Sequence, residues 1–310
     1  MKVDLYYCSK PLQYMNLCNM PDSVISSSNK KILLVYNAFM GADRFAHYMR
    51  KYDKRWDKVI LCNSRWWFIN LLFLNVENLF SPIDSSFYGM LHFIFRFNLY
   101  LYEEGAGTYN KLYINKRFHL ASKLFGTGLQ MGHSKYLKGV IVYQPEFYKE
   151  QIHPTCKVLK FQHTNSEIIK RESKLLFKVY ANTLAENIKV KGKKILLYIT
   201  DWDYDDEIIK KMVIMNPQYD ISFIKPHPHR KREDLPYVEN VEPIYSSILV
   251  EVLLQYWLDN GNTITVFHQS STAIIPFAGL ITAYDMSRKE EQKNYKSIIK
   301  KLCEFNYKQN

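Results

Sequence analysis

The segment FIKPHPHR, residues 223–230, places a histidine between two prolines directly after an apolar run. Pro226 and Pro228 fix their own φ angles and restrict the residues before them, so the backbone would hold His227 rigidly. Histidine titrates near neutral pH and can hydrogen-bond to a phosphate oxygen or protonate it. A lone histidine is usually structural, but Lys225 makes this stiff turn basic. We therefore predict that His227 contacts an anionic ligand.

A second polar group, HQSST at residues 268–272, follows the apolar run TITVF and opens a helical pattern. Hydroxyl groups and free backbone N–H groups at a helix N-terminus form an anion site. Ser270, Ser271 and Thr272 would supply the hydroxyls. The same residue types also cap helices without any ligand. The two roles are compatible, because a capped N-terminus still carries free amides.

Carboxylates follow two further apolar runs. Glu103, Glu104 and Gly105 come after LYLY, where a glycine permits a turn and a close backbone approach. Such a carboxylate is a candidate general base, although an exposed acidic turn is the better explanation of this segment taken alone. The segment 201–206, DWDYDD, contains an Asp-x-Asp pattern that binds metal in some glycosyltransferases. Capping of a following helix explains one or two of its four carboxylates, which leaves at least one candidate base.

The elements that position these groups alternate between strands and helices. Apolar runs that predict strands lie at 3–8, 31–36, 58–62, 99–102, 140–143, 195–200, 219–224 and 263–267. Helical patterns lie at 12–17, 43–51, 167–184, 205–215, 246–256, 272–278 and 289–305. This alternation predicts an α/β protein with parallel sheets covered by helices.

The alternation stops and restarts along the chain, which predicts two α/β domains. We expect an N-terminal domain at 1–155, a connector at 156–190 and a C-terminal domain at 191–310, with a cleft between the domains. Ligands of open parallel sheets bind beyond the carboxyl ends of the strands. All the polar groups described above follow predicted strands.

Charge, cysteine content and apolar runs limit the classes of ligand and cellular setting that fit this chain. The formal net charge of +12 favours polyanions, but the basic residues are scattered, which argues against a nucleic-acid-binding protein. The five cysteines form no CxxC pair, which fits a reducing compartment and disfavours a zinc site. No apolar run reaches the roughly 18 residues of a spanning helix. The apolar region 66–80 would form either a core helix or a contact with a membrane surface.

The chain resembles the bacterial sialyltransferases, and is most similar to glycosyltransferase family 52, the lipooligosaccharide sialyltransferases. The opening segment LYYCSKPLQ, residues 5–13, resembles the first strand and turn of that family. Glu103-Glu104-Gly105 matches its acidic-acidic-Gly motif, and KPHP, ending at Pro228, matches its His-Pro motif. Ser270-Ser271-Thr272 matches its Ser-Ser/Thr motif.

The resemblance implies a GT-B fold, in which two Rossmann-like domains bind an acceptor on the N-terminal side and CMP-sialic acid on the C-terminal side. It implies an inverting transfer to a terminal galactose, with neither metal nor cofactor. Catalytic roles fall to His227, which acts on the leaving phosphate, and to a carboxylate base. Residues implied in donor binding are Gly105, Lys225, Pro228, Glu251, Ser270, Ser271 and Thr272, with Glu251 on the cytidine ribose.

The identity of the base stays open at this point. Some bacterial sialyltransferases place it in the acidic-acidic-Gly motif, which nominates Glu104. Family 52 places it in the C-terminal domain shortly before the His-Pro motif, which nominates Asp201 or Asp205. We favour these aspartates because the resemblance to family 52 is closer.

The expected setting is the cytoplasmic face of the inner membrane, where the protein would bind peripherally to anionic lipid and act on lipooligosaccharide or capsular glycan. Related enzymes include homodimers. Three alternatives remain: a sugar-nucleotide epimerase or hydrolase of the same fold, a transferase of another CMP-linked ulosonic acid, and a basic nucleic-acid-binding protein.

Overall fold

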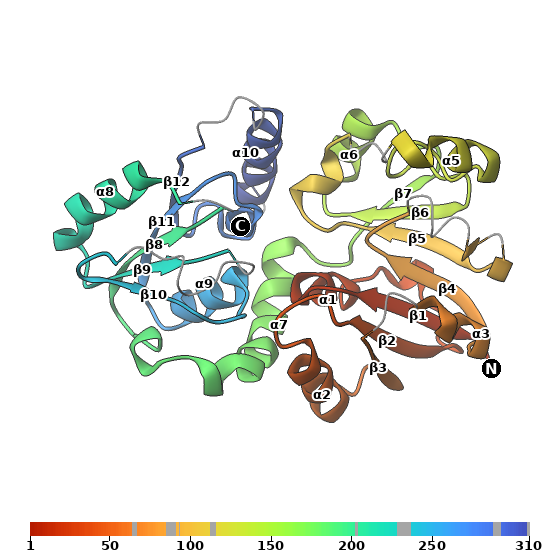
Figure 1. The fold of residues 1–310 in the computed structure, drawn as a ribbon, viewed down its shortest axis with the longest axis horizontal. Helices are drawn as coiled ribbons and strands as arrows, with labels where there is room; N and C mark the ends of the chain where they lie inside the picture. Colours follow the sequence, from red (N-terminus) through yellow and green to blue (C-terminus); the bar gives the residue numbers. More distant parts are fainter. Residues whose placement is uncertain are drawn as a thin grey trace. The chain divides into compact units, whose positions relative to one another are not determined.

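The chain divides into two compact units, Met1–Thr164 and Asn165–Asn310, in the computed structural model (Figure 1). The structure describes residues 1–63, 67–84, 91–92, 94–111, 116–201, 204–227, 237–287 and 293–308. The segment expected as a connector, 156–190, contributes strand β7 (Lys157–Lys160) to the sheet of the first unit and helix α7 (Asn165–Tyr180) to the second.

The first unit contains a parallel sheet of seven strands in the order β3-β2-β1-β4-β5-β6-β7. Besides β7, its strands are β1 (Val3–Cys8), β2 (Lys30–Tyr36), β3 (Lys58–Cys62), β4 (Val76–Ser81), β5 (Asn98–Tyr102) and β6 (Leu137–Val142). All six residues of β1 are buried, as expected for a central parallel strand covered on both faces. The α-helices described here are α1 (Pro11–Leu17), α2 (Ala42–Tyr52), α3 (Asn70–Phe73), α5 (His119–Phe125) and α6 (Pro145–Ile152).

The second unit contains a parallel sheet of five strands in the order β10-β9-β8-β11-β12. They are β8 (Lys194–Ile199), β9 (Ile221–Lys225), β10 (Val241–Pro243), β11 (Thr263–His268) and β12 (Thr282–Asp285). Its α-helices in the described residues are α7, α8 (Asp206–Met215), α9 (Val250–Asp259) and α10 (Lys293–Tyr307). In both sheets the first strand of the unit lies inside and the order reverses beside it, which is the Rossmann arrangement.

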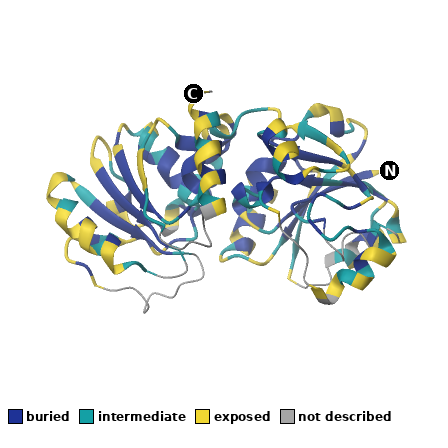
Figure 2. Cartoon of the chain, turned by 90° about the horizontal axis from the view of Figure 1, so that it is seen from above, coloured by how far each residue is buried: buried dark blue, intermediate teal, exposed yellow. Residues whose placement is uncertain are grey.

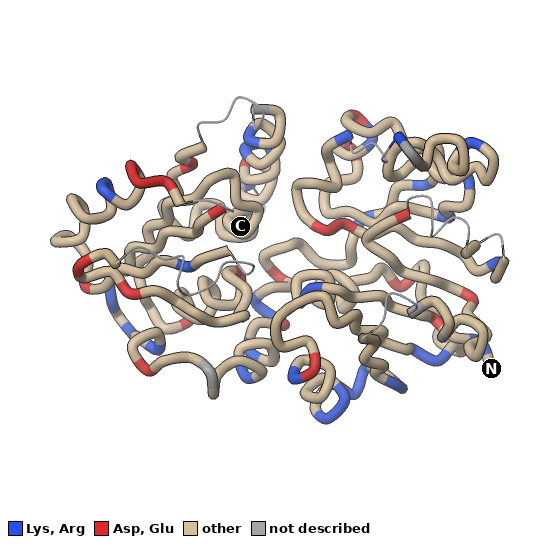
Figure 3. The backbone as a smooth tube through the Cα atoms, viewed as in Figure 1, with Lys and Arg blue, Asp and Glu red and all other residues tan. Residues whose placement is uncertain are grey.

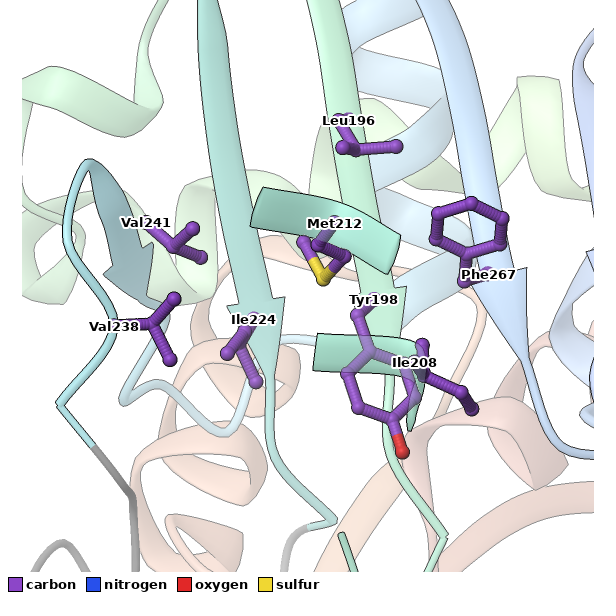
Figure 4. Close-up of a cluster of buried hydrophobic side chains, with 8 residues drawn as sticks. All are labelled: Leu196, Tyr198, Ile208, Met212, Ile224, Val238, Val241 and Phe267. Atoms are coloured by element: carbon purple, nitrogen blue, oxygen red, sulfur yellow. The ribbon is translucent and has the colours of Figure 1, made fainter. Parts of the chain in front are cut away.

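Alternating side chains of the second sheet pack against helices on opposite faces. On one face, Ile208 and Met212 of α8 join a buried cluster with six residues of the sheet and its loops, drawn in Figure 4: Leu196, Tyr198, Ile224, Val238, Val241 and Phe267. On the other face, Phe223 stacks on Trp257 of α9 at a centroid distance of 5.3 Å. The central strands β8, β9 and β11 are accordingly mostly buried between more exposed helices (Figure 2).

The prediction of two Rossmann-like α/β domains is confirmed, and the eight predicted strands are all present. Four strands were not predicted from the sequence: β4, β7, β10 and β12. The prediction of a helix over 66–80 is wrong, because Val76–Ser81 forms β4 and only Asn70–Phe73 is α-helical. None of the described helices is both long and apolar enough to cross a membrane.

Gly105, which follows β5, has φ 129° and ψ −164°, a conformation that is essentially restricted to glycine. The turn brings Glu104 next to Lys10, and the two side chains form an ion pair. It also lets the backbone N–H of Glu104 donate to Thr108 Oγ1 at 2.9 Å. The glycine in this motif therefore has a backbone role that requires no ligand.

We expect Gly105→Ala to lower the free energy of unfolding by about 1–3 kcal/mol, because alanine would be strained at this φ. Gly107→Ala is the matched control, since nothing lies within 4 Å of a β-carbon built there and its φ is not positive. Urea denaturation measures both. Equal stability of the two variants would contradict the backbone role of Gly105.

Candidate functional site

A cavity of about 390 Å³ lies at the carboxyl ends of β8, β9 and β11, entirely within the second unit. We call it the strand-end pocket. Its lining comes from the segments 199–201, 225–227, 247–251 and 269–272, and from Tyr295 of α10. It therefore brings together seven residues singled out from the sequence: Asp201, Lys225, His227, Glu251, Ser270, Ser271 and Thr272.

The strand order explains why a cavity forms here. The chain leaves β8 toward β9 and later returns to β11 on the other side of β8. In right-handed crossovers, connections that run in opposite directions lie on opposite faces of the sheet, so the loops after β8 and β11 diverge. Ligands of doubly wound sheets bind at this reversal.

His227 and Lys225 enter the pocket from the end of β9. The backbone N–H of His227 donates to Thr200 Oγ1 at 2.9 Å, which ties the turn to the end of β8. Lys225 is only 4% exposed, and its Nζ donates to the carbonyl oxygen of Ser246 at 2.6 Å. Burial lowers the pKa of Lys225 to about 8. This ammonium group is therefore still protonated at neutral pH and is held at the pocket wall.

Glu251 lies in the first turn of α9 and lines the pocket with a side chain that is largely buried. Burial raises the pKa of Glu251 above its ordinary value. A hydrogen bond from its own backbone N–H offsets this rise only in part, so the buried carboxyl group is unfavourable for the isolated protein. Such a group is well suited to accept hydrogen bonds from neutral hydroxyl groups of a ligand.

Ser270 has φ 51°, a left-handed conformation that is uncommon for residues other than glycine. Asp285, at the end of β12, stabilises it, because Asp285 Oδ1 accepts from the backbone N–H of Ser270 at 3.2 Å. The hydroxyl of Ser270 lies 2.6 Å from that of Ser287, whose own backbone N–H donates to Asp285 Oδ1 at 2.9 Å. Asp285 thus determines the shape of the turn that presents Ser270.

Ser271 is the N-cap of the following helix, with its hydroxyl accepting from the N–H of Ala273 at 3.3 Å. The backbone N–H of Ser271 donates to His268 Nδ1 at 3.2 Å. Burial lowers the pKa of His268 to about 4, so the ring is neutral and its proton is on Nε2. The helix Thr272–Phe277 is a 3-10 helix containing Pro276 and not the α-helix expected.

The two candidate aspartates of the 201–206 segment occupy different places. Asp201 lines the strand-end pocket. Asp205 is the N-cap of α8, where its Oδ1 accepts from the N–H of Glu207 at 3.0 Å, and it does not line the pocket. The structure thus separates a capping carboxylate from one that faces the cavity. Asp203 lies outside the described residues, as does Pro228.

The acidic residues before Gly105 belong to the first unit and also have different environments. Glu103 is buried, and its Oε2 accepts from Tyr109 Oη at 2.5 Å and from the backbone N–H of Tyr143 at 2.9 Å. Burial raises the pKa of Glu103 to about 7 despite these hydrogen bonds. Glu103 is therefore part of the packing of the unit, whereas Glu104 reaches the surface and pairs with Lys10.

Several lining residues escaped the sequence analysis, among them Thr200, Gln269 and Tyr295. Asp285 was also missed, because its strand is short and largely exposed. A second cavity of about 500 Å³, between η9 (Thr272–Phe277), β12 and α10, is lined mostly by apolar side chains together with His268 and Asp285. Within the described residues no group of His, Cys, Asp and Glu side chains is arranged to hold a metal ion.

Comparison with known proteins shows the fold. No family model matches this chain, and no curated protein sequence matches it. Solved structures do, with low sequence identity. The UDP-GlcNAc 2-epimerase from Neisseria meningitidis, bound to UDP-GlcNAc, is similar with a TM-score of 0.54 and 11% identity, covering 99% of this chain and 93% of that one.

Two further structures give the same result. The UDP-GlcNAc 2-epimerase from Methanocaldococcus jannaschii has a TM-score of 0.52 at 10% identity, covering 99% of this chain and 93% of that one. The wall teichoic acid polymerase TagF, an H444N variant with CDPG, has a TM-score of 0.52 at 11% identity, covering 95% of this chain and 82% of that one. The chain therefore has the GT-B fold of two Rossmann-like domains.

We expect Asp285→Asn to lower the free energy of unfolding at pH 7 by about 1–3 kcal/mol, because charge-assisted hydrogen bonds to Ser270 and Ser287 are weakened. Burial alone would raise the pKa of Asp285, but hydrogen bonds from Ser287 and the neighbouring His268 hold it below its ordinary value. A lowered pKa in the folded state stabilises the fold above the unfolded pKa, and this contribution is lost as the pH falls through the folded value.

The difference in the free energy of unfolding between wild type and Asp285→Asn should therefore shrink below about pH 3.9. Urea denaturation at several pH values measures it. Glu239→Gln, at an exposed position before β10, is the control and should differ little from wild type at every pH. A difference for Asp285→Asn that is constant across this range would contradict the account.

Proposed function

We propose that this protein is an inverting sialyltransferase, which transfers sialic acid from CMP-sialic acid to a terminal galactose of lipooligosaccharide or capsular glycan. The observation that supports the proposal is the strand-end pocket, where His227, Ser270 and Ser271 line one cavity with the buried Glu251. The sequence had nominated these residues from separate motifs, and the pocket unites them.

The pocket suits a donor whose leaving group is a nucleoside monophosphate. When CMP departs, negative charge grows on its phosphate, and stabilising that charge is the main electrostatic task. The hydroxyl of Ser271 donates to a phosphate oxygen, and that of Ser270 does so after rotating away from Ser287. The ammonium of Lys225 is held nearby, and the imidazole of His227 protonates the departing oxygen or hydrogen-bonds to it. The carboxyl group of Glu251 accepts from the ribose hydroxyls.

The acceptor hydroxyl must lose a proton as it attacks, which requires a base. We propose Asp201 for this role, because it lines the pocket while Asp205 is engaged in capping α8. Glu104 is the alternative that the resemblance leaves open, and it is already ion-paired with Lys10. The proposed reaction requires no metal and no cofactor, so activity should persist in EDTA.

The proposed place of action is the cytoplasmic face of the inner membrane. The acceptor would be a glycan carried on lipid, and the net charge of +12 favours approach to an anionic bilayer. The protein would bind this surface peripherally.

Release of CMP from CMP-sialic acid with a galactose-terminated acceptor tests the activity. We expect His227→Ala to lower kcat by about a hundred- to ten-thousand-fold, the usual contribution of general acid–base catalysis. His47→Ala, at an exposed position on α2, is the control and should retain wild-type turnover. Near-normal turnover of His227→Ala would remove its catalytic role, and no CMP release by the wild type would overturn the proposed function.

A sugar-nucleotide epimerase or hydrolase is the second candidate, because two of the similar structures are UDP-GlcNAc 2-epimerases. Thermal shifts with CMP and with UDP separate the two functions. We expect CMP to stabilise the wild type more than UDP, and Glu251→Gln to weaken CMP binding because the amide accepts fewer hydrogen bonds from ribose. Glu207→Gln, exposed on α8, is the control. A larger shift with UDP would favour the epimerase.

A further inference from the structure

The segment between Glu104 and Glu146 contains no acidic residue, although 30 of the 310 residues in the chain are Asp or Glu. At that average, 41 residues would hold about four. The same segment carries six basic residues: Lys111, Lys116, Arg117, Lys123, Lys135 and Lys138. Figure 3 shows Lys and Arg along this part of the first unit. This run starts after Glu104, contains the rest of the connection between β5 and β6 and extends through β6, and all its Lys, Arg, Asp and Glu side chains are basic.

Two large apolar side chains project from the helical part of this connection. Residues 116–125, which we call the α5 segment, comprise the 3-10 turn Lys116–Phe118 and the helix α5. Leu120 and Leu124 are each 72% exposed, whereas Ser122 is buried. Leu120 and Leu124 are one helical turn apart and lie opposite Ser122. The outermost side of this helix is therefore apolar, the reverse of a helix that faces only water.

Basic groups surround the two leucines. Lys116 and Lys123 are exposed on the same segment. Gly126 ends α5 in a left-handed conformation, and a β-carbon built on it would overlap the side chain of Lys135. Lys135 therefore lies across the end of the helix. Leu120 and Leu124 thus form an apolar ridge that is bordered by the ammonium groups of these three lysines.

We infer that the α5 segment docks on an anionic lipid bilayer. Leu120 and Leu124 enter the interface between headgroups and acyl chains, while Lys116, Lys123 and Lys135 contact lipid phosphates. Apolar burial combined with attraction of basic residues to anionic lipid is how interfacial helices bind membranes. The inference rests on the proposed function only in supplying its membrane partner, because a lipid-linked acceptor would be reached at this surface.

The chemistry of the ridge favours lipid over nucleic acid. Surfaces that bind single strands present aromatic rings for stacking along a basic groove. Here the most exposed apolar side chains are the aliphatic Leu120 and Leu124, while the aromatic Phe118 is 46% exposed, and aliphatic groups gain free energy only by leaving water. Positive charge with two protruding leucines complements an anionic bilayer.

Flotation of the full-length protein with vesicles tests the inference. We expect vesicles of phosphatidylcholine mixed with phosphatidylglycerol to bind it at least about tenfold more tightly than phosphatidylcholine alone, with binding weakened by salt. The double change Leu120→Ser and Leu124→Ser should weaken binding to the mixed vesicles about tenfold or more. The double change Lys116→Glu and Lys123→Glu should abolish the preference for anionic lipid.

Two control variants make the result specific. Ile214→Ser, on α8 of the second unit, removes an apolar side chain that is 74% exposed and should leave vesicle binding unchanged. Phe73→Ser, on α3, tests the region first expected to contact a membrane, since Phe73 is 82% exposed. We expect all variants to keep the melting temperature of the wild type, because the altered side chains are exposed.

Three results would overturn the inference: wild type that does not bind anionic vesicles, α5-segment variants that bind as wild type does, or loss of binding in Phe73→Ser alone. Binding of an oligonucleotide that depends on Lys116 and Lys123, without vesicle binding, would also overturn it and identify a nucleic-acid surface. Vesicle binding does not require transfer. Failure of the proposed function, seen as no CMP release, is therefore distinguishable from failure of membrane docking.

Discussion

Parallel strands can be joined only by crossovers. In the second unit the connection from β8 to β9 and the connection from β11 to β12 run away from β8 in opposite directions. This constraint separates the loops that follow β8 and β11 and opens a pocket where they diverge. The side chains that line it come from four segments distant in sequence and from Tyr295 of α10, so the topology of the sheet assembles most of the site. Burial then determines the chemistry: Lys225 and Glu251 are largely removed from water beside a cavity that a ligand could fill.

The roles of the acidic residues follow from their surroundings more than from their motifs. Glu103 and Glu104 are adjacent in sequence, yet Glu103 hydrogen-bonds inside the first unit and Glu104 pairs with Lys10 at the surface. Asp201 and Asp205 follow the same strand, yet only Asp201 lines the pocket. Asp285 belongs to none of the sequence motifs. It lies on β12, next to β11, and fixes the backbone of Ser270 by accepting from its N–H.

The sequence predicted the strands that are buried on both faces, because a continuous apolar run such as KILLVY leaves few alternatives. It missed β4, where an apolar region is divided between a short helix and a strand, and β7, β10 and β12, which are three or four residues long. Motifs at strand ends predicted six residues of the pocket lining, and the family resemblance added Glu251. Asp285 and Tyr295 could not be predicted, because their proximity to the motifs depends on how β12 and α10 pack.

The most direct test of the central claim, that the strand-end pocket receives the nucleotide of the donor, is a crystal structure with CMP bound. The account predicts a phosphate oxygen within hydrogen-bond distance, about 2.5–3.2 Å, of Ser270 or Ser271 and of His227, with the ribose hydroxyls at Glu251. CMP bound away from the ends of β8, β9 and β11, or with its phosphate turned from these side chains, would contradict it.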